Sequence, residues 1–382
     1  MLVNLHLSDT TCRYETRLFK QIESISRCCQ EFEHIFVAGM VVGDLEVENP
    51  THKVTIHRFP KGFSQWMPGP LVRLLGICRY SASVYVTYRH HSVKLINVHR
   101  WWLLPLAVVL KFAWGSRLLY DAHELETETI GLSGFRKLFS QLVERASIRF
   151  VDSLVVVGDA IASAYALMYP GIKPFVVMNC PPYRVISTLD ERPTLLRAAL
   201  GVQESTPLFL YQGGLVENRG IRELVSKLRA EHEIELALVF MGYGPLEGWL
   251  HEQREHDSRV HVHPAVPPSA VLDYTAAADA GIFLYDGSCL NHQYCLPNKL
   301  FEFMMCGLFI VASDLVEVRR VIGEYGYGTV ISETSGSVFS DAMVSLRRYS
   351  SPPDLEAVQR KYSWMVQEQQ YVAAVRYAMR IR

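Results

Sequence analysis

Hydrophobic and polar positions show two kinds of pattern along this chain. Short runs rich in β-branched and aromatic residues predict buried strands, and longer stretches with apolar residues three or four positions apart predict helices. The two kinds of segment alternate over most of the sequence. Such alternation is typical of parallel sheets covered by helices on both faces, so the predicted fold class is α/β.

The predicted elements fall into two series. In the first, the strands are 2–7, 34–38, 54–59, 95–98, 118–121, 153–157 and 175–178, and the helices include 135–149 and 160–168. In the second, the strands are 208–212, 235–241, 260–263, 280–284, 309–312 and 329–331, each but the last followed by a helical pattern. Residues 355–382 predict one or two helices with no strand after them.

The length of the chain also predicts two domains. A single hydrophobic core stops growing at roughly 250 to 300 residues, and the chain has 382. The run Cys180-Pro181-Pro182 interrupts regular structure between the two series. We therefore predict Rossmann-like doubly wound domains at 1–183 and 184–360, followed by a C-terminal helix at 361–382 that packs back on the first domain. Ligands bind such sheets at the carboxyl ends of the strands, so the cleft between the domains is where functional motifs are expected.

Charge is distributed unevenly, although the net formal charge is only −1. The stretch 50–120 contains ten Lys and Arg but no Asp or Glu, together with Trp66, Trp101, Trp102 and Trp114. Cations beside interfacial aromatic residues predict peripheral contact with an anionic membrane. The alternative is that 101–114 is a buried helix with the cations scattered around it. The segment is shorter than the ~20 residues of a spanning helix, and without a recognition motif nucleic acid is not an expected partner.

The eight cysteines show no CxxC spacing, and no apolar leader precedes the first predicted strand. Neither a zinc site nor secretion is therefore suggested, and a cytoplasmic protein with reduced thiols is expected.

Two glycine-rich turns follow predicted strands of the second series. Gln212-Gly213-Gly214 precedes Arg219-Gly220, and Gly242-Tyr243-Gly244-Pro245 follows the next strand. Glycines let backbone N–H groups approach an anion. A helix N-terminus also favours an anion, and an arginine can donate hydrogen bonds to two oxygens of the anion. These turns predict a diphosphate site, although each alone could be an ordinary tight turn.

A third motif begins a predicted helix at Pro297 that ends at Gly307. Asn298 and Lys299 lie on the same face of its first turns as Glu302. An anion at the N–H groups of residues 298–300 would leave Glu302 about one turn away, where it could accept hydrogen bonds from the vicinal hydroxyls of a ribose. The alternative is a surface Lys–Glu pair worth about 0.3 kcal/mol.

The three motifs together resemble the donor half of the retaining glycosyltransferases of family 4, which have the GT-B fold. In that family a Gly-rich turn, a GxGP loop and a PNKLFE-like helix occur in this order. The first half adds Tyr120-Asp121-Ala122-His123-Glu124, which is similar to the segment whose histidine faces the donor sugar. The resemblance thus implies that domain 1–183 binds the acceptor and domain 184–360 the nucleotide sugar.

The resemblance further implies catalytic roles for His123, Arg219, Lys299 and Glu302, with no cofactor, no metal and a UDP- or GDP-sugar donor. It implies substrate contacts from Gly213, Gly214, Gly242, Gly244, Val266, Tyr294, Asn298, Leu300 and Glu124. The family often has a further glutamate where Tyr294 stands, and its Arg-Lys pair is represented here by Gly214 and Arg219. Lys299 is expected to supply the second cation.

The predicted function is transfer of a hexose-type sugar to a glycan or lipid-linked acceptor in surface polysaccharide or lipopolysaccharide synthesis, at the inner face of the cell membrane. Two alternatives remain open. A GT-B sugar-nucleotide epimerase would use the same diphosphate site, and a non-catalytic nucleotide-sugar-binding assembly subunit would fit the missing glutamate at 294. Fold similarity alone does not separate them.

Overall fold

The computed structural model describes residues 2–13, 15–60, 70–129, 132–184, 194–285, 287–332, 336–348 and 352–381. The chain forms two compact units. Unit 1 comprises Met1–Val177 and Glu368–Arg382, and unit 2 comprises Met178–Gln367. These limits differ from the predicted boundaries at 183/184 and 360/361. The chain leaves unit 1 directly after its last strand rather than at the proline pair, and it returns within a helix rather than before one.

Unit 1 is built on a sheet that has eight strands among the described residues, in the order β3-β4-β2-β1-β5-β6-β7-β8. The strands are β1 Leu2–Leu7, β2 Phe32–Val41, β3 Glu46–Thr51, β4 Val54–Pro60, β5 Val93–Val98, β6 Arg117–Ala122, β7 Ser153–Val156 and β8 Phe175–Val176. Neighbouring strands pair in parallel except β3, which runs antiparallel to β4. The sequence pattern missed β3 because it has no buried face. Its glutamates and proline are typical of an edge strand that must not pair further.

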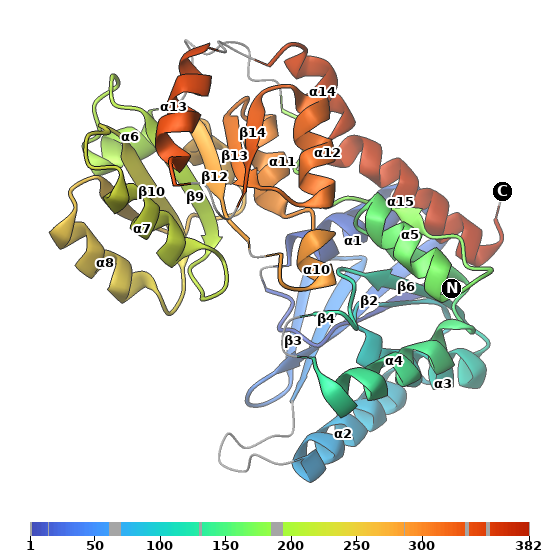
Figure 1. The fold of residues 1–382 in the computed structure, drawn as a ribbon. Helices are drawn as coiled ribbons and strands as arrows, with labels where there is room; N and C mark the ends of the chain where they lie inside the picture. The colour runs from blue at the N-terminus through green and yellow to red at the C-terminus, as the bar shows by residue number, and fades with distance from the viewer. Residues whose placement is uncertain are drawn as a thin grey trace. The chain divides into compact units, whose positions relative to one another are not determined.

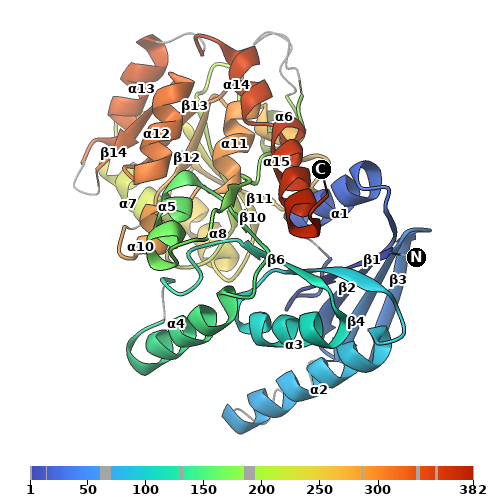
Figure 2. The ribbon, with the colours of Figure 1, turned by 90° about the vertical axis from the view of Figure 1, so that its right-hand side faces the viewer.

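The helices of unit 1 connect these strands (Figures 1 and 2). They are α1 Thr16–Cys28, α2 Pro70–Tyr88, the short 3₁₀ helix η1 Trp101–Leu103, α3 Leu104–Trp114, α4 Gly134–Ile148 and α5 Asp159–Met168. The connections through α2, α3 and α4 all lead in the same direction across the sheet, from β4 to β5, β6 and β7. Right-handed crossovers in one direction place their helices on one face of a sheet. In both views α2, α3 and α4 lie side by side.

Unit 2 contains a parallel sheet that has six strands in its described part, in the order β11-β10-β9-β12-β13-β14. The strands are β9 Leu208–Gly214, β10 Ala237–Tyr243, β11 Val260–Pro264, β12 Ala280–Phe283, β13 Phe309–Ser313 and β14 Gly328–Ile331. The helices are α6 Leu195–Leu200, α7 Ile221–Ala230, α8 Glu247–His256, α9 Val271–Thr275, α10 Leu290–Gln293, α11 Asn298–Met305, α12 Val316–Tyr325, α13 Val338–Arg348 and α14 Leu355–Lys361. The prediction that no helix follows the last strand was wrong, because α13 covers that edge with buried Val338 and Phe339.

The last helix, α15 Trp364–Met379, belongs to both units. At its start, the N–H of Trp364 donates to the carbonyl of Pro181, and Gln367 accepts a hydrogen bond from the N–H of Met178 at 2.8 Å. Further along, Tyr371 is fully buried and its hydroxyl accepts a hydrogen bond from Asn97 of β5 at 3.1 Å. The end of the chain therefore completes the core of unit 1.

The predicted α/β class with two Rossmann-like parallel sheets is confirmed. In each sheet the strand order reverses at one point, between β1 and β5 in unit 1 and between β9 and β12 in unit 2. Side chains from the carboxyl ends of the two central strands converge at such a switch point, which makes it the expected ligand site. Among the described residues, no helix is long and apolar enough to cross a membrane.

Candidate functional site

The first polar site lies at the switch point of unit 2, where β9 ends. Lys299, near the start of α11, is 7% exposed, and its Nζ atom lies 3.6 Å from the ring centroid of Tyr211 and 5.6 Å from that of Tyr285. The guanidinium of Arg219 lies 4.9 Å from the same Tyr285 ring. A cation of α11 and a cation of the segment before α7 thus share one aromatic side chain, which fixes them beside the end of β9.

Burial lowers the pKa of Lys299 well below its usual value of 10.5, and the positive charge of Arg219 lowers it further, while Glu302 opposes the shift. Burial and the neighbouring cation together outweigh the stabilising effect of Glu302 on the ammonium. This arrangement suits a site whose ligand brings negative charge.

The glycines of the two predicted turns allow close backbone approach. Gly213 has a φ of 121°, and a Cβ there would lie 3.6 Å from Nζ of Lys299. Gly242 pairs with Gly213 across β9 and β10, and a Cβ on Gly242 would meet the carbonyl oxygen of Gly213 at 1.9 Å. The turns at Gly214 and Gly244 continue these two strand ends. Side chains larger than hydrogen would separate the strands and fill the space that faces Lys299.

A hydrogen-bonded chain positions Glu302. The amide nitrogen of Gln212, at 3% exposure, donates to the Glu302 carboxylate, and its amide oxygen accepts from the hydroxyl of Thr275 at 2.7 Å. Gln212 is therefore a positioning residue to which the sequence prediction gave no role, although it stands in the quoted turn. The feature of the sequence that could have indicated this role is the position of Gln212 immediately before the glycines, at the end of a buried strand.

The remaining predicted residues of unit 2 take varied positions. Asn298 is exposed and accepts a hydrogen bond from Asn179 at 2.8 Å, while Leu300 is fully buried in the core. Val266 is half-buried against the same core in the loop after β11, and Tyr294 lies at the C-terminal cap of α10. Their contacts to a substrate stay predictions. Lys299, Arg219, Gly213 and Glu302 form the cluster that the structure brings together.

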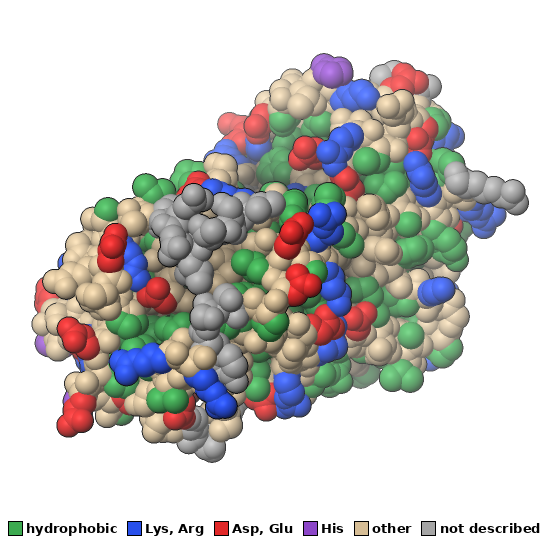
Figure 3. All heavy atoms as spheres, turned by 90° about the horizontal axis from the view of Figure 1, so that it is seen from above, with side chains coloured by type: hydrophobic (Ala, Val, Ile, Leu, Met, Phe, Trp, Pro, Cys, Tyr) green, Lys and Arg blue, Asp and Glu red, His purple; other side chains and the backbone are tan. Residues whose placement is uncertain are grey.

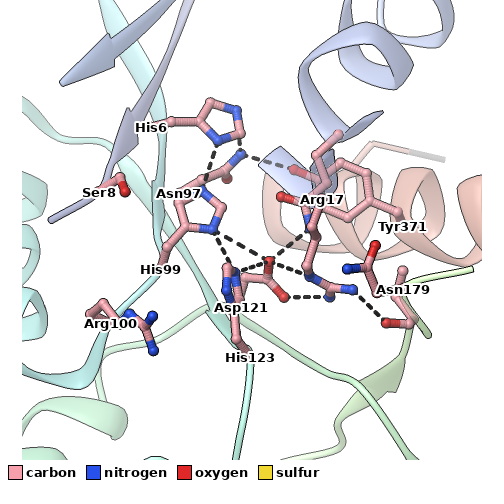
Figure 4. Close-up of polar contacts among 12 residues, drawn as sticks. His6, Ser8, Arg17, Asn97, His99, Arg100, Asp121, His123, Asn179 and Tyr371 are labelled. Carbon is pink, nitrogen blue, oxygen red and sulfur yellow. Dashed lines mark hydrogen bonds and ion pairs between the residues drawn. The ribbon is translucent and has the colours of Figure 1, made fainter. Parts of the chain in front are cut away.

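The second polar site lies at the carboxyl ends of β5 and β6 in unit 1 (Figure 4). Asp121, fully buried, forms a two-pronged ion pair with Arg17 of α1, at 2.6 Å and 3.0 Å. Gln21 donates to the same carboxylate at 2.7 Å. Burial raises the pKa of Asp121, but Arg17 outweighs it and, with His123 and His99, holds the pKa well below 3.8.

Three imidazoles form a contiguous row next to Asp121 (Figure 4). Nδ1 of His6 lies 3.0 Å from Nε2 of His99, and Nδ1 of His99 lies 3.1 Å from Nε2 of His123. Nε2 of His123 lies 3.0 Å from Asp121. The side chain of His123 is 21% exposed, whereas those of His99 and Asp121 are at 2% and 0%. His123 is thus the member of this row that faces outward, held by an ionised carboxylate behind it.

Asp121, His99 and His123 also place one potential ligand atom each within 4.8 Å of one another, the arrangement of a metal site. Both oxygens of Asp121 already accept from Arg17, and a metal ion would compete with that guanidinium. The cluster therefore favours an orienting role, and the absence of a resident metal stays a prediction. Glu124, directly beyond His123, is half-buried.

The sequence prediction assigned no role to Gln21, His6, His99 or Asp121. Asp121 and His99 do stand at the ends of predicted strands, which was the one signal available. Their contacts depend on pairing across 100 residues or so of sequence and follow only from the order of the strands.

The buried histidines predict an acid-sensitive unit 1. Burial, with the charge of His99, lowers the pKa of His6 well below 6.5; burial also lowers that of His123, against the opposing effect of Asp121. Below pH 6.5 the unfolded chain would therefore bind protons that the native unit does not, so the free energy of unfolding falls as the pH falls through that value. We expect the free energy of unfolding to fall by about 1.4 kcal/mol per pH unit for each of these histidines. Urea unfolding at pH 7.5 and 5.5 measures the fall. A His6→Asn variant should show a smaller fall, and an equal fall would contradict this explanation.

Comparison with known proteins agrees with this architecture. Residues 206–348 match the family described as Glycosyl transferases group 1. The structure of sucrose-phosphate synthase from Thermosynechococcus elongatus superposes with a TM-score of 0.74 at 14% identity, covering 98% of both chains. That of Anabaena Alr3699/HepE in complex with UDP-glucose gives 0.72 at 16% identity, covering 98% of this chain and 99% of the other. This chain has the GT-B fold.

A third GT-B structure, α,α-trehalose 6-phosphate synthase from Burkholderia multivorans, gives a TM-score of 0.67 at 14% identity and covers 98% of each chain. No curated protein sequence is significantly similar to the chain. Residues 206–348, which match the family described as Glycosyl transferases group 1, contain Gly213, Arg219, Lys299 and Glu302. At these identities the structural similarity establishes the fold but not a particular reaction.

Proposed function

We propose that this GT-B protein is a retaining glycosyltransferase that moves a hexose-type sugar from a UDP- or GDP-sugar to a glycan or lipid-linked acceptor. The observation that carries the proposal is the pair of cations formed by buried Lys299 and half-buried Arg219, beside Gly213 at the switch point of the unit 2 sheet, within the residues that match Glycosyl transferases group 1. HepE, which shares the fold, has been crystallised with UDP-glucose.

In this proposal the two cations act on the leaving group. When the bond between the sugar C1 and the diphosphate oxygen breaks, its electron pair goes to that oxygen, and negative charge grows on the diphosphate. Lys299, Arg219 and the N–H groups at the start of α11 stabilise this charge better in the transition state than before it, which lowers the barrier. The acceptor hydroxyl forms the new bond to C1 on the face from which the diphosphate leaves, and its proton passes to the departing diphosphate. No metal or cofactor is required for the charge to be balanced.

Glu302 is proposed to hold the ribose of the donor. Gln212 and Thr275 fix its carboxylate, so that it can accept hydrogen bonds from vicinal hydroxyls without reorganising. His123 is proposed to contact a sugar hydroxyl. Because its Nε2–H donates to Asp121, Nδ1 of the neutral ring is an acceptor. Assignment to family 4, retention of configuration and a role in surface polysaccharide synthesis belong to the same proposal.

A Glu302→Gln substitution tests the ribose contact. We expect the affinity for the nucleoside diphosphate to fall about 10- to 100-fold, because a charged acceptor of two hydroxyls is worth about 1.5–3 kcal/mol. Isothermal titration with UDP and GDP measures the change. The matched control is Glu356→Gln on α14, a glutamate with 69% side-chain exposure. Unchanged affinity in the Glu302 variant would contradict the assignment.

A panel of nucleotides and a product assay test the reaction itself. The correct nucleoside diphosphate at 100 times its dissociation constant should stabilise the protein by about 2.7 kcal/mol, seen as a thermal shift. Donor consumption that requires an acceptor, with the anomeric configuration of the product determined by NMR, would support a retaining transferase. Conversion of the donor without any acceptor would indicate an epimerase. Binding without turnover on glycan or lipid-linked acceptors would indicate an assembly subunit.

A further inference from the structure

Helix α4 of unit 1 presents an apolar stripe to solvent. Phe135, Leu138, Phe139 and Leu142 are 81%, 63%, 51% and 63% exposed. Their spacing of three, four and seven residues places them on one side of the helix. Single exposed apolar residues are ordinary on protein surfaces, but a continuous stripe of large ones marks a contact surface.

The two neighbouring helices extend this surface. On α3, Val109 and Phe112 are 62% and 65% exposed, and on α2, Leu75 and Val86 are 61% and 58% exposed. Helix α3 packs against α4, and Trp114 at the end of α3 stacks on Tyr85 of α2 with ring centroids 6.0 Å apart. The three helices lie side by side in both views (Figures 1 and 2). We call their exposed side chains the α2–α4 face.

The charge of the α2–α4 face has one sign. Helices α2 and α3 contain no Asp or Glu, and the one acidic residue of α4, Glu144, is fully buried. Glu144 accepts hydrogen bonds from the hydroxyls of Tyr120, Tyr165 and Tyr169. The carboxylates nearby are neutralised as well, Glu128 by Lys137 and Asp152 by Lys111 and Arg117.

The exposed cations of the face are Arg79 on α2, Arg136 and Arg145 on α4, and Arg149 directly after it. Figure 3 shows a different face of the molecule, on which acidic and basic side chains are interspersed. An apolar surface with arginines and no exposed carboxylate is complementary to a layer that is negatively charged outside and apolar beneath.

We infer that the α2–α4 face docks on an anionic lipid leaflet. Phe135, Phe139, Leu142 and Phe112 would enter the boundary between head groups and acyl chains, and the arginines would pair with lipid phosphates. A second copy of the chain is disfavoured as the occupant, because a twofold contact would bring two surfaces of the same positive charge together. The inference concerns unit 1 alone and goes beyond the proposed reaction. If the acceptor is lipid-linked, docking on the leaflet would bring the protein to its acceptor.

This surface includes α2 and α3 of the stretch 50–120, where the sequence predicted membrane contact, but it does not use the tryptophans of that stretch as anchors. Trp102 donates its indole N–H to Asp9, Trp114 stacks on Tyr85, and Trp101 is half-buried, so none of the three is a free interfacial anchor. Trp66 lies outside the described residues. Arg58, Arg100, Lys111 and Arg117 are paired with carboxylates. The largest apolar contribution comes from α4, which the prediction did not include.

Vesicle co-sedimentation tests the inference on the full chain. We expect the wild type to bind vesicles of phosphatidylcholine mixed with phosphatidylglycerol more tightly than vesicles of phosphatidylcholine alone, and less tightly at high salt. A Phe135→Ser/Phe139→Ser variant should lose about tenfold or more in partitioning, because two large apolar side chains no longer enter the bilayer. Arg136→Glu/Arg145→Glu should lose the preference for anionic lipid. The matched control is Leu167→Ser on α5, which is 83% exposed but lies apart from α2–α4 in both views.

The outcomes separate this inference from the proposed function. Binding of nucleoside diphosphate should be the same in all three variants, since every substituted residue belongs to unit 1 and the proposed diphosphate site belongs to unit 2. Equal partitioning of wild type and the Phe135/Phe139 variant, or failure of the wild type to bind anionic vesicles, would overturn the inference and leave the donor site untouched. A lipid-free dimer that the same serine substitutions dissociate would assign the face to self-association instead. Circular dichroism confirms that each variant is folded.

Discussion

Lys299→Met should reduce kcat/KM for the nucleotide sugar by about 100- to 1000-fold, the loss that follows removal of one preorganised donor to a developing negative charge. Methionine has a similar length and fills the space beside Tyr211, so the fold should be retained. The free energy of unfolding should be unchanged or higher, because an ammonium whose pKa is lowered by burial costs stability. Steady-state kinetics together with urea unfolding measures both effects. Lys361→Met is the control, with a side chain that is 57% exposed.

The same lysine predicts how donor binding depends on pH. A bound diphosphate favours the protonated amine, so binding raises the pKa of Lys299 from its lowered value in the free protein. Affinity should therefore be highest below the pKa of the free protein and should fall as the pH rises through it. Titration calorimetry in buffers of different ionisation enthalpy should detect proton uptake. Proton uptake that persists unchanged in Lys299→Met would show that another group titrates.

Asp121→Ala should destabilise unit 1 by about 3–5 kcal/mol, because it leaves Arg17 buried without a partner charge. Arg17 is only 5% exposed, and its remaining described hydrogen bond goes to the carbonyl of Val177. In scanning calorimetry we expect the transition of unit 1 to move down by roughly 10 °C, at 2–4 °C per kcal/mol for a unit of this size. The transition of unit 2 should not move.

A double variant separates the ion pair from simple loss of packing. Arg17→Met/Asp121→Ala removes both charges and should recover part of the lost stability, since the uncompensated charge is gone. The contribution of Asp121 should be fully present above pH 3.8, its usual pKa, and should decline as the pH falls toward its lowered native value. If the single variant melts within a degree of the wild type, Arg17 has found another counterion.

Much of the fold could be predicted because its strands are buried on both faces. Leu208–Gly214 and Ala237–Tyr243, for example, are apolar runs that lead into glycines, a pattern typical of buried parallel strands. The edge strand β3 could not be predicted this way, because a strand paired on one side and exposed on the other has no apolar run to detect. The return of the chain to unit 1 within α15 also has no local signal. Residues 367 and 368 belong to one uninterrupted helical pattern.

The candidate site likewise contains residues that the sequence could predict and residues that it could not. Gly213 and Arg219 stand in one short motif, and Lys299 and Glu302 in another. Each motif could be recognised locally, and the resemblance to family 4 linked the two. Gln212 was visible in its motif, but its bonds to Thr275 and Glu302 span 63 and 90 residues. The Arg17–Asp121 pair spans 104. Such long-range polar contacts depend on strand order and helix packing, which a local pattern does not specify.

Because α15 belongs to both units, the two units have their sequences completed at different times during synthesis. Unit 2 is one continuous segment, 178–367, whereas unit 1 lacks Tyr371 and its neighbours until the last residues are available. During synthesis the later unit is therefore the first to have its whole sequence outside the ribosome, because unit 1 also needs residues 368–382. A segment limited to 1–177 would leave Asn97 facing water, while 178–367 contains everything that its own sheet requires.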